Sequence, residues 1–355
     1  MQAAILERFG QPLSITEAPD PQVGTGEIVV DVLAAPVLPY AAEVFSGERN
    51  YSLEPPVIPG AGGVGRVRAV GPDSTRLAVG DIVWCDSTVR SRDDAVTPDI
   101  TLQGLTARGD GGLRLARHFH HGSFAERMAV PTENATPLGP VPPAEAYRWV
   151  SLGVHLVPYG GLRAGGLRPG ETVLISGATG NFGSAGVAVA VAMGARRVVA
   201  PGRNEAVLAQ LRQRFGDRVA PVPLTGDPAA DDAAVRAAAG APIDLVLDLL
   251  SPAAPASAAR AAAMTVREHG RVVLMGGVGD ELRLPYPWLM HNSVTVRGQW
   301  MYPRVAVREL VGLVHAGLLD LSRNEVTTFP LDAARQAVEH AAAHAAPFQR
   351  TAITP

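Results

Sequence analysis

The fold of this chain is indicated by one segment, Thr172-Val173-Leu174-Ile175-Ser176-Gly177-Ala178-Thr179-Gly180-Asn181-Phe182-Gly183. Residues 172–176 form an apolar run with the length of a buried strand, and the small residues of 184–193 predict a helix. A glycine-rich loop between a strand and a helix N-terminus can bind a pyrophosphate through its backbone amides. The sequence therefore predicts a strand, a phosphate-binding loop and a helix in direct succession.

Six loop residues are the first predicted cofactor contacts. Gly180 and Gly183 would let the backbone approach phosphate and let the helix pack on the strand. The amides of Asn181, Phe182 and Gly183 would face the anion. The alternative is an ordinary strand-to-helix turn. The predicted contacts in this loop are Gly177, Thr179, Gly180, Asn181, Phe182 and Gly183.

An earlier cluster, Gly60-Ala61-Gly62-Gly63-Val64-Gly65, matches the dinucleotide pattern G-x-G-x-x-G letter for letter. Its context argues against that role, because prolines precede it and a strand-like run follows it, whereas the pattern needs a strand before and a helix after. We expect these glycines to serve turns and close packing.

The choice of nucleotide is expected at the end of the second strand, within Gly202-Arg203-Asn204. An acidic residue here would bind the ribose hydroxyls of NAD, and an arginine accommodates the 2′-phosphate of NADP. The chain has no carboxylate until Glu205, while Arg203 supplies a charge and Asn204 a second donor. The sequence favours NADP(H), with a solvated surface arginine as the alternative.

Strands and helices alternate through the second half of the chain, which predicts an α/β fold with a doubly wound parallel sheet. The first 150 residues instead carry short strand-like runs between Gly and Pro, typical of an antiparallel barrel-like domain. We read residues 87–121 as a long irregular excursion. Further predicted elements are strands at 197–200, 243–249 and 271–275, helices at 205–215, 254–267, 304–316 and 331–343, and a strand-like tail.

Composition excludes several classes of function. All 31 basic residues are Arg, so no lysine can form a Schiff base or a P-loop contact. The formal net charge is −3 with scattered arginines, which gives no nucleic-acid surface. No apolar run is long enough to span a membrane, and the N-terminus lacks a signal-peptide pattern, so we expect a cytoplasmic protein. Cys85 is the single cysteine; we expect it to be buried in a strand, and one cysteine excludes a multi-thiolate zinc site.

The chain resembles the medium-chain dehydrogenase/reductase superfamily along nearly its full length. The resemblance implies a Rossmann domain inserted in a GroES-like, β-rich substrate domain, with residues 1–150 and 303–355 in the substrate domain and 151–302 in the Rossmann domain. It also implies an active site between them and a homodimer formed through the last strand, near 293–297. The segments that carry it are 1–4, 26–32, 59–71, 77–83, 122–126 and 167–171.

The same resemblance identifies the positions of the catalytic zinc ligands. They fall at Leu38, at Ala61-Gly62 and at Gly153, none of which can bind zinc. We therefore expect no metal, and a likeness to the quinone oxidoreductase and enone reductase branch. Quinone oxidoreductases often have Asn where this chain has Leu38, which is a departure from that branch.

The nicotinamide contacts implied by the resemblance follow the fifth and sixth strands, where ligands of open α/β sheets bind. They are Gly276, Gly277 and Val278 after one strand and Trp300 after the other, with Tyr302 beside it as a possible pocket wall.

Hydride delivery leaves an enolate or alkoxide that must be protonated or stabilised. Tyr40 is the first candidate donor, with a packing role as the alternative. The weaker candidates are Tyr51, His155 and Tyr159, and water is another.

His118, His120 and His121 raise the question of a metal, because His118 and His120 would share one face if the segment were a strand. Exposed loop histidines are the favoured interpretation.

The hypothesis from the sequence is hydride transfer from NADPH to a small quinone or α,β-unsaturated carbonyl without zinc. The alternatives are a metal-free alcohol dehydrogenase or ketone reductase, and an NADP(H)-binding protein with little turnover.

Overall fold

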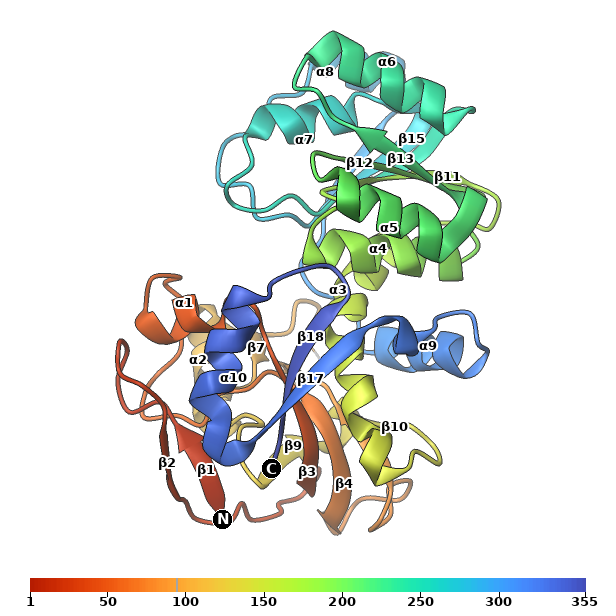
Figure 1. The fold of residues 1–355 in the computed structure, drawn as a ribbon. Helices are drawn as coiled ribbons and strands as arrows, with labels where there is room; N and C mark the ends of the chain where they lie inside the picture. Colours follow the sequence, from red (N-terminus) through yellow and green to blue (C-terminus); the bar gives the residue numbers. More distant parts are fainter. Residues whose placement is uncertain (94) are drawn as a thin grey trace. The chain divides into compact units, whose positions relative to one another are not determined.

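The computed structural model describes residues 1–93 and 95–355, and the chain divides into two compact units (Figure 1). Unit 1 contains Met1–Gly153, Leu321–Ala345 and Gln349–Pro355. Unit 2 contains Val154–Asp320 and Ala346–Phe348. The return to unit 1 thus falls at Leu321, later than the predicted residue 303, because the helix after residue 304 belongs to unit 2. No helix in the described ranges is long and apolar enough to cross a membrane.

Unit 2 is built on a six-stranded sheet whose order is β13-β12-β11-β14-β15-β16. Every neighbouring pair is parallel. The first three strands run outward in one direction from β11 and the next three in the other, which is the doubly wound order of dinucleotide-binding folds. The strands are β11 (Thr172–Ser176), β12 (Arg197–Gly202), β13 (Val219–Pro223), β14 (Ile243–Asp248), β15 (Val266–Leu274) and β16 (Thr295–Gly298).

Helices cover this sheet because the connections between parallel strands must cross over it. Buried aliphatic residues of the strands, among them Leu174, Val199 and Val246, pack against helix residues such as Val235 and Ala263. The helices of unit 2 are α3 (Leu152–Ala164, which begins at the division), α4 (Asn181–Ala192), α5 (Glu205–Phe215), α6 (Pro228–Ala239), α7 (Ala256–Ala263), α8 (Tyr286–His291) and α9 (Val305–His315).

Two predicted boundaries in unit 2 are wrong. The helix expected over 184–193 begins three residues earlier, at Asn181, so the predicted anion-binding amides belong to its first turn. The helix expected over 254–267 is shorter, and a strand already starts at Val266, where it pairs with Ile243 before the regular register resumes at Arg271.

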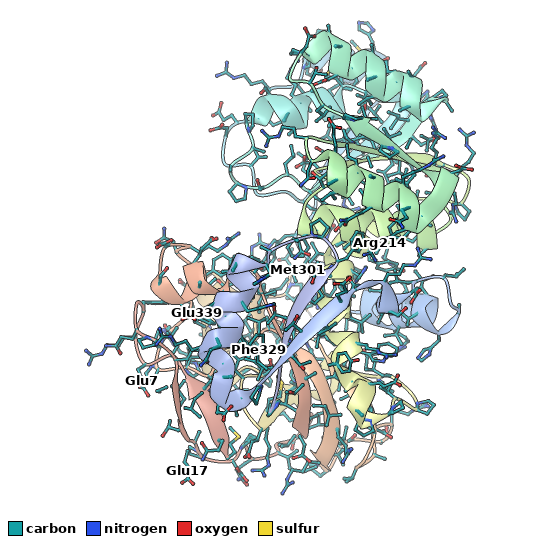
Figure 2. The ribbon with its side chains drawn as sticks, viewed as in Figure 1. Glu7, Glu17, Arg214, Met301, Phe329 and Glu339 are labelled. Atoms are coloured by element: carbon teal, nitrogen blue, oxygen red, sulfur yellow. The ribbon has the colours of Figure 1, made fainter. Side chains whose placement is uncertain are left out.

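Unit 1 is a mainly antiparallel sheet in the order β10-β5-β4-β3-β18-β17, with β9 also paired to β3. The C-terminal strand β18 pairs with β3, so both ends of the chain build one unit. The helix α10 (Ala334–Ala343) lies along β17 and β18 (Figures 1 and 2), where the Phe329 ring centroid is 5.2 Å from that of His340. The strands of this sheet are β3 (Glu27–Val37), β4 (Gly63–Val70), β5 (Ile82–Cys85), β9 (Arg127–Pro131), β10 (Ala135–Pro137), β17 (Glu325–Pro330) and β18 (Gln349–Thr354). β1 (Gln2–Ile5) and β2 (Ser14–Glu17) form a separate antiparallel pair.

The segment 87–121 is more regular than predicted. It forms a small antiparallel sheet of β6 (Thr88–Arg90), β7 (Ile100–Leu102) and β8 (Thr106–Arg108), followed by the helix α2 (Gly109–His118). Gly112 packs against β7, where an added Cβ would lie 2.4 Å from the carbonyl oxygen of Ile100. Gly112 therefore allows the helix to approach the sheet closely, and this part of the segment is not an irregular loop.

Candidate functional site

The loop after β11 has the geometry of an anion cradle. Gly177 adopts a left-handed φ of 78°, and the Gly180 amide donates to its carbonyl oxygen over 2.9 Å. Gly180 then precedes the first residue of α4, and it has no side chain that could cap the helix. The first backbone amides of a helix have no partner within the helix, so this end favours an anion.

Gly183 is the most constrained position in this loop. A Cβ there would lie 1.9 Å from the carbonyl oxygen of Gly177. Non-bonded atoms cannot come this close, so no side chain fits. By contrast, a Cβ at Gly180 would meet only the Gly177 oxygen, at 3.3 Å. Gly183 therefore allows α4 to pack on the loop, whereas Gly180 leaves the space before the first turn of α4 free of a side chain.

The end of β12 lies against the same loop. Gly202 is the last residue of β12, and a Cβ there would lie 2.3 Å from the Thr179 methyl carbon. Arg203 follows and is exposed, and its guanidinium makes no ion pair with any residue that the structure describes. Asn204 caps α5, since its Oδ1 accepts a hydrogen bond from the Val207 amide. Its side-chain NH₂ is therefore the group left for the predicted role of second donor.

The exits of β14 and β15 are fastened together by backbone hydrogen bonds. The Met275 amide donates to the Asp248 carbonyl oxygen over 3.1 Å, and the Gly277 amide donates to that of Leu250 over 2.8 Å. Gly276 and Gly277 are exposed, and Val278 is half-buried. These predicted nicotinamide contacts thus follow the fifth strand on a loop whose start is fixed by β14.

Trp300 and Tyr302 differ in environment although both follow β16. Trp300 is 42% exposed, whereas Tyr302 is 5% exposed and packs beside Gly160. The Gln299 amide donates to the Leu274 carbonyl oxygen over 3.0 Å, which joins this segment to the exit of β15. Trp300 is therefore the accessible aromatic side chain at this strand end.

Sequence reasoning missed Asp248 as a site residue. It is the last residue of β14 and is 3% exposed, and its Oδ1 has no hydrogen-bond partner among the described residues. Burial raises the pKa of this carboxyl group, and hydrogen bonds from Ser176, Leu250 and Gly276 offset that only in part. The available signal was an acidic residue that ends a mainly apolar, mostly buried strand.

Tyr40, the first candidate proton donor, lies in unit 1 just before α1 (Ala41–Ser46). The Arg49 guanidinium carbon is 4.0 Å from the centroid of its ring, and the Tyr51 ring meets it edge-on at 6.3 Å. Glu43 holds Arg49 by an ion pair of 2.6 Å. Burial and then Tyr51 raise the pKa of Tyr40, so its phenol keeps its proton at physiological pH.

The weaker catalytic candidates have different surroundings. The Tyr159 hydroxyl donates to Glu309 over 2.9 Å, and Arg163 pairs with the same carboxylate, so these groups tie α3 to α9. His155 is 1% exposed. Tyr51 packs with Tyr40 and Arg49. The arrangement assigns Tyr159 a structural contact.

The positions that the sequence resemblance implies for catalytic zinc ligands carry no metal-binding side chains. Trp84 lies beside two of them: its indole carbon Cζ2 would be 3.5 Å from a Cβ at Gly62, and Cη2 would be 3.6 Å from one at Gly153. Leu38 follows β3. No group of three or more potential metal ligands occurs in residues 1–93 and 95–355. Leu38, Gly62 and Gly153 themselves supply no side chain that can bind a zinc ion.

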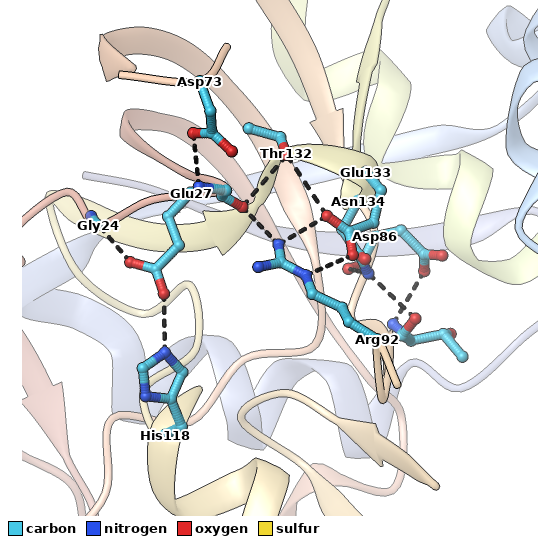
Figure 3. A network of polar contacts seen from close by, with 11 residues as sticks. Gly24, Glu27, Asp73, Asp86, Arg92, His118, Thr132, Glu133 and Asn134 are labelled. Carbon is cyan, nitrogen blue, oxygen red and sulfur yellow. Dashed lines mark hydrogen bonds and ion pairs between the residues drawn. The ribbon is translucent and has the colours of Figure 1, made fainter. Parts of the chain in front are cut away.

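The histidine segment is not a strand, so the alternative of a face shared by His118 and His120 does not apply; His118 and His121 are exposed, but His118 belongs to a helix and not to a loop. His118 ends α2, and its Nε2 lies 2.7 Å from Oε1 of Glu27 (Figure 3). Nε2 of His120 lies 2.9 Å from the Pro56 carbonyl oxygen. Arg92 joins the same network through Glu133 and Gly26. These contacts attach the segment 87–121 to the sheet of unit 1.

The glycine cluster 60–65 runs into β4, as expected from its context, and no helix follows it. Gly60 and Gly62 have positive φ values of 113° and 74°. A Cβ at Gly60 would lie 2.6 Å from the Phe124 ring. The prediction that these glycines serve turns and packing is confirmed.

Comparison with known proteins gives matches to both units. The family model "Alcohol dehydrogenase GroES-like domain" matches residues 24–141, and "Zinc-binding dehydrogenase" matches residues 182–316. An alcohol dehydrogenase of Moraxella sp. (strain TAE123) is 30% identical over 348 residues, which are 94% of this chain and 93% of that relative. An acryloyl-coenzyme A reductase of Metallosphaera sedula is 31% identical over 226 residues, 62% of this chain and 63% of that relative. The solved structure of a thermostable alcohol dehydrogenase from Pyrobaculum aerophilum has a TM-score of 0.75 at 25% identity, covering 100% of this chain and 99% of that one.

Proposed function

This chain belongs to the medium-chain dehydrogenase/reductase superfamily, and we propose that it transfers hydride from NADPH to a quinone or an α,β-unsaturated carbonyl without zinc. Membership makes it a nicotinamide-dependent oxidoreductase. Three points go beyond family membership and are proposed here: the choice of NADPH, the class of acceptor and the independence of zinc. Each depends on a separate feature of the chain.

Arg203 supports the choice of NADPH. It follows β12 with an exposed guanidinium that no described residue neutralises, so it can pair with a 2′-phosphate. Replacement by an acidic residue would be expected if the ribose hydroxyls of NAD were the target. The amides of Asn181, Phe182 and Gly183, at the start of α4, would receive the pyrophosphate.

The loops after β15 and β16 would hold the nicotinamide. The exposed backbone of Gly276 and Gly277, with Val278, offers polar groups for the carboxamide, and Trp300 offers an accessible ring beside them. When bound, NADPH supplies the hydride. The chain's own contribution is to orient the reactants, which by itself can supply a large part of a rate enhancement.

The lack of ligand side chains beside Trp84 carries the proposal of zinc independence. Side chains at Gly62 and Gly153 would meet the indole ring, and Leu38 provides only a hydrocarbon. Zinc enzymes of this superfamily polarise the substrate oxygen with the metal, which this donor set cannot bind. A quinone or enone fits such a site, because its extended conjugation spreads the charge left by hydride addition.

Tyr40 is the proposed group that stabilises this charge. Its phenol stays protonated, so it can donate a hydrogen bond to the substrate oxygen. If the proton transfers to that oxygen, the positive charge of Arg49 on the ring face would stabilise the phenolate that remains. Water completes the protonation if Tyr40 only donates a hydrogen bond.

A second candidate is oxidation of an alcohol or reduction of a ketone. The names of the relatives favour it, since the Moraxella protein is an alcohol dehydrogenase, whereas acryloyl-coenzyme A reduction by the Metallosphaera relative favours the alkene. The third candidate is a protein that binds NADP(H) with little turnover. We also propose a homodimer through β16, whose four residues are exposed along a free sheet edge.

Initial rates of NADPH oxidation with a small quinone, an enone and a ketone separate these candidates. Turnover with the quinone or enone at least tenfold above that with the ketone supports the proposal. Preference for the ketone would support the second candidate. Binding of NADPH without turnover of any acceptor would support the third.

A further inference from the structure

Asp248 occupies the point of the sheet where the strand order changes direction. It pairs with Ser176, the last residue of β11, on one side and with Leu274, the last residue of β15, on the other. The crevice at the carboxyl ends of the strands next to such a switch point is where ligands of doubly wound sheets bind. Asp248 therefore lies between the two loops that the proposed function assigns to the cofactor.

The side chain of Asp248 contacts both loops. The Ser176 hydroxyl, directly before the phosphate loop, donates to its carboxyl group, as do the backbone amides of Leu250 and Gly276. The contact with Gly276 is close, because a Cβ there would lie 2.5 Å from Oδ2. One carboxyl group thus joins the exits of β11, β14 and β15.

Burial of the Asp248 carboxyl group costs free energy that its hydrogen bonds offset only in part. A buried carboxyl group is unfavourable when its hydrogen-bonding capacity is not met, and Oδ1 of Asp248 has no partner among the described residues. The groups that do contact the side chain are a hydroxyl and two amides, not a cation. A hydrophobic residue would fill this position in the core at less cost, so the polar contacts with the loops are the reason for an acid here.

We propose that Asp248 is a positioning residue that holds the phosphate loop and the Gly276–Val278 loop in the relative position that NADP(H) binding requires. The inference depends on the proposed cofactor only for its functional consequence. The contacts of Asp248 with the two loops exist in the cofactor-free protein, so their effect on the loops can be measured without any nucleotide.

The variants Asp248→Ala, Asp248→Asn and Ser176→Ala test this role. Oδ1 of Asp248 has no hydrogen-bond partner among the described residues, so the hydrogen bonds to the carboxyl group fall on Oδ2, and the carboxamide oxygen of Asn can replace it. We expect D248A to weaken NADPH binding by about tenfold or more, D248N to stay within about threefold of the wild type, and S176A to fall between them, given the usual worth of one to three hydrogen bonds. Binding is measured from the fluorescence of NADPH.

Asp244 supplies a matched control on the same strand. It accepts hydrogen bonds from the Thr172 amide and from Arg267, at the opposite end of β14. We expect D244A to lower the melting temperature and to leave the NADPH dissociation constant within about twofold, because lost ion pairs of this kind affect stability locally. A general loss of folding would instead weaken binding in both variants.

Hydrogen exchange in the cofactor-free protein gives the direct readout. The amides of Gly276 and Gly277 should exchange faster in D248A than in the wild type, and D248N should restore their protection. Unchanged exchange and unchanged NADPH affinity in D248A would overturn the proposal, as would a D248N variant as impaired as D248A. If the wild type does not bind NADPH, the proposed function fails, while the exchange experiment still decides whether Asp248 fastens the loops.

Discussion

Gly183 packs directly on the backbone of Gly177 in the phosphate loop: a Cβ at Gly183 would lie 1.9 Å from the Gly177 carbonyl oxygen. The helix α4 can begin at this loop only because neither residue adds bulk there. Gly180, three residues earlier, has more space, so the two glycines have separable roles.

Gly183→Ala should lower both stability and cofactor affinity, because the clash with backbone cannot be relieved by a rotamer change. Gly180→Ala should keep the melting temperature within a few degrees, since its Cβ meets only one atom at 3.3 Å. It should still weaken NADPH binding by about tenfold, because a methyl group would obstruct the approach of phosphate. Thermal melts and NADPH titrations of the two variants make the comparison; equal effects of both on melting would contradict it.

Arg203→Gln should weaken NADPH binding by about ten- to a hundredfold, which corresponds to the loss of charge-assisted hydrogen bonds to a phosphate. The affinity for NADH should change by less than about twofold, because that cofactor lacks the phosphate. Arg214 on α5 (labelled in Figure 2) is the matched control. Its guanidinium carbon lies 4.3 Å from the Phe348 ring centroid, so R214Q should not discriminate between the cofactors. A parallel loss of both affinities in R203Q would show that Arg203 is not the selectivity residue.

Tyr40→Phe should lower kcat by about a hundredfold if the phenol donates to the substrate oxygen, in the range usual for acid catalysis. The KM for NADPH should stay near the wild-type value. Because burial and Tyr51 raise the pKa of Tyr40, wild-type activity should show no decline from phenol ionisation below about pH 10, the ordinary tyrosine pKa. The pH profile of kcat checks this. Near-normal activity of Y40F would assign Tyr40 to packing.

Cys85 should be inert in the native protein. It is 1% exposed, and burial, with a smaller effect of Asp86, raises the pKa of its thiol to about 12. The thiolate is the reactive form, so the thiol should resist a disulfide reagent at pH 8 and react fully once denaturant is added. Rapid labelling of one thiol per folded chain would contradict the structure of β5.

The strand, loop and helix from Thr172 to Ala192 could be predicted because their signals are local: an apolar run, glycines and small helical residues. The segment 87–121 could not, since Gly112 in α2 is needed for contact with β7, a neighbour distant in the sequence. The exposed strand β17 also went unnoticed, because it has no buried face that would give alternating hydrophobicity.

The candidate site shows the same division. Arg203 could be proposed as a cofactor contact from its position after a predicted strand. Asp248 was missed because its importance comes from contacts with Ser176 and Gly276, which only the order of strands in the sheet brings together. Tyr159 was a plausible acid in the sequence, but its partner Glu309 lies 150 residues away.

The most direct test of the central claim is the rate of NADPH oxidation by a small quinone, measured beside NADH and beside enzyme treated with a chelator, with zinc content determined on the same sample. We expect turnover that prefers NADPH by at least about tenfold, because an arginine contacts its phosphate; the turnover should persist after chelation, and the zinc content should be substoichiometric. One zinc ion per chain, with activity lost on chelation and restored by zinc, would contradict it.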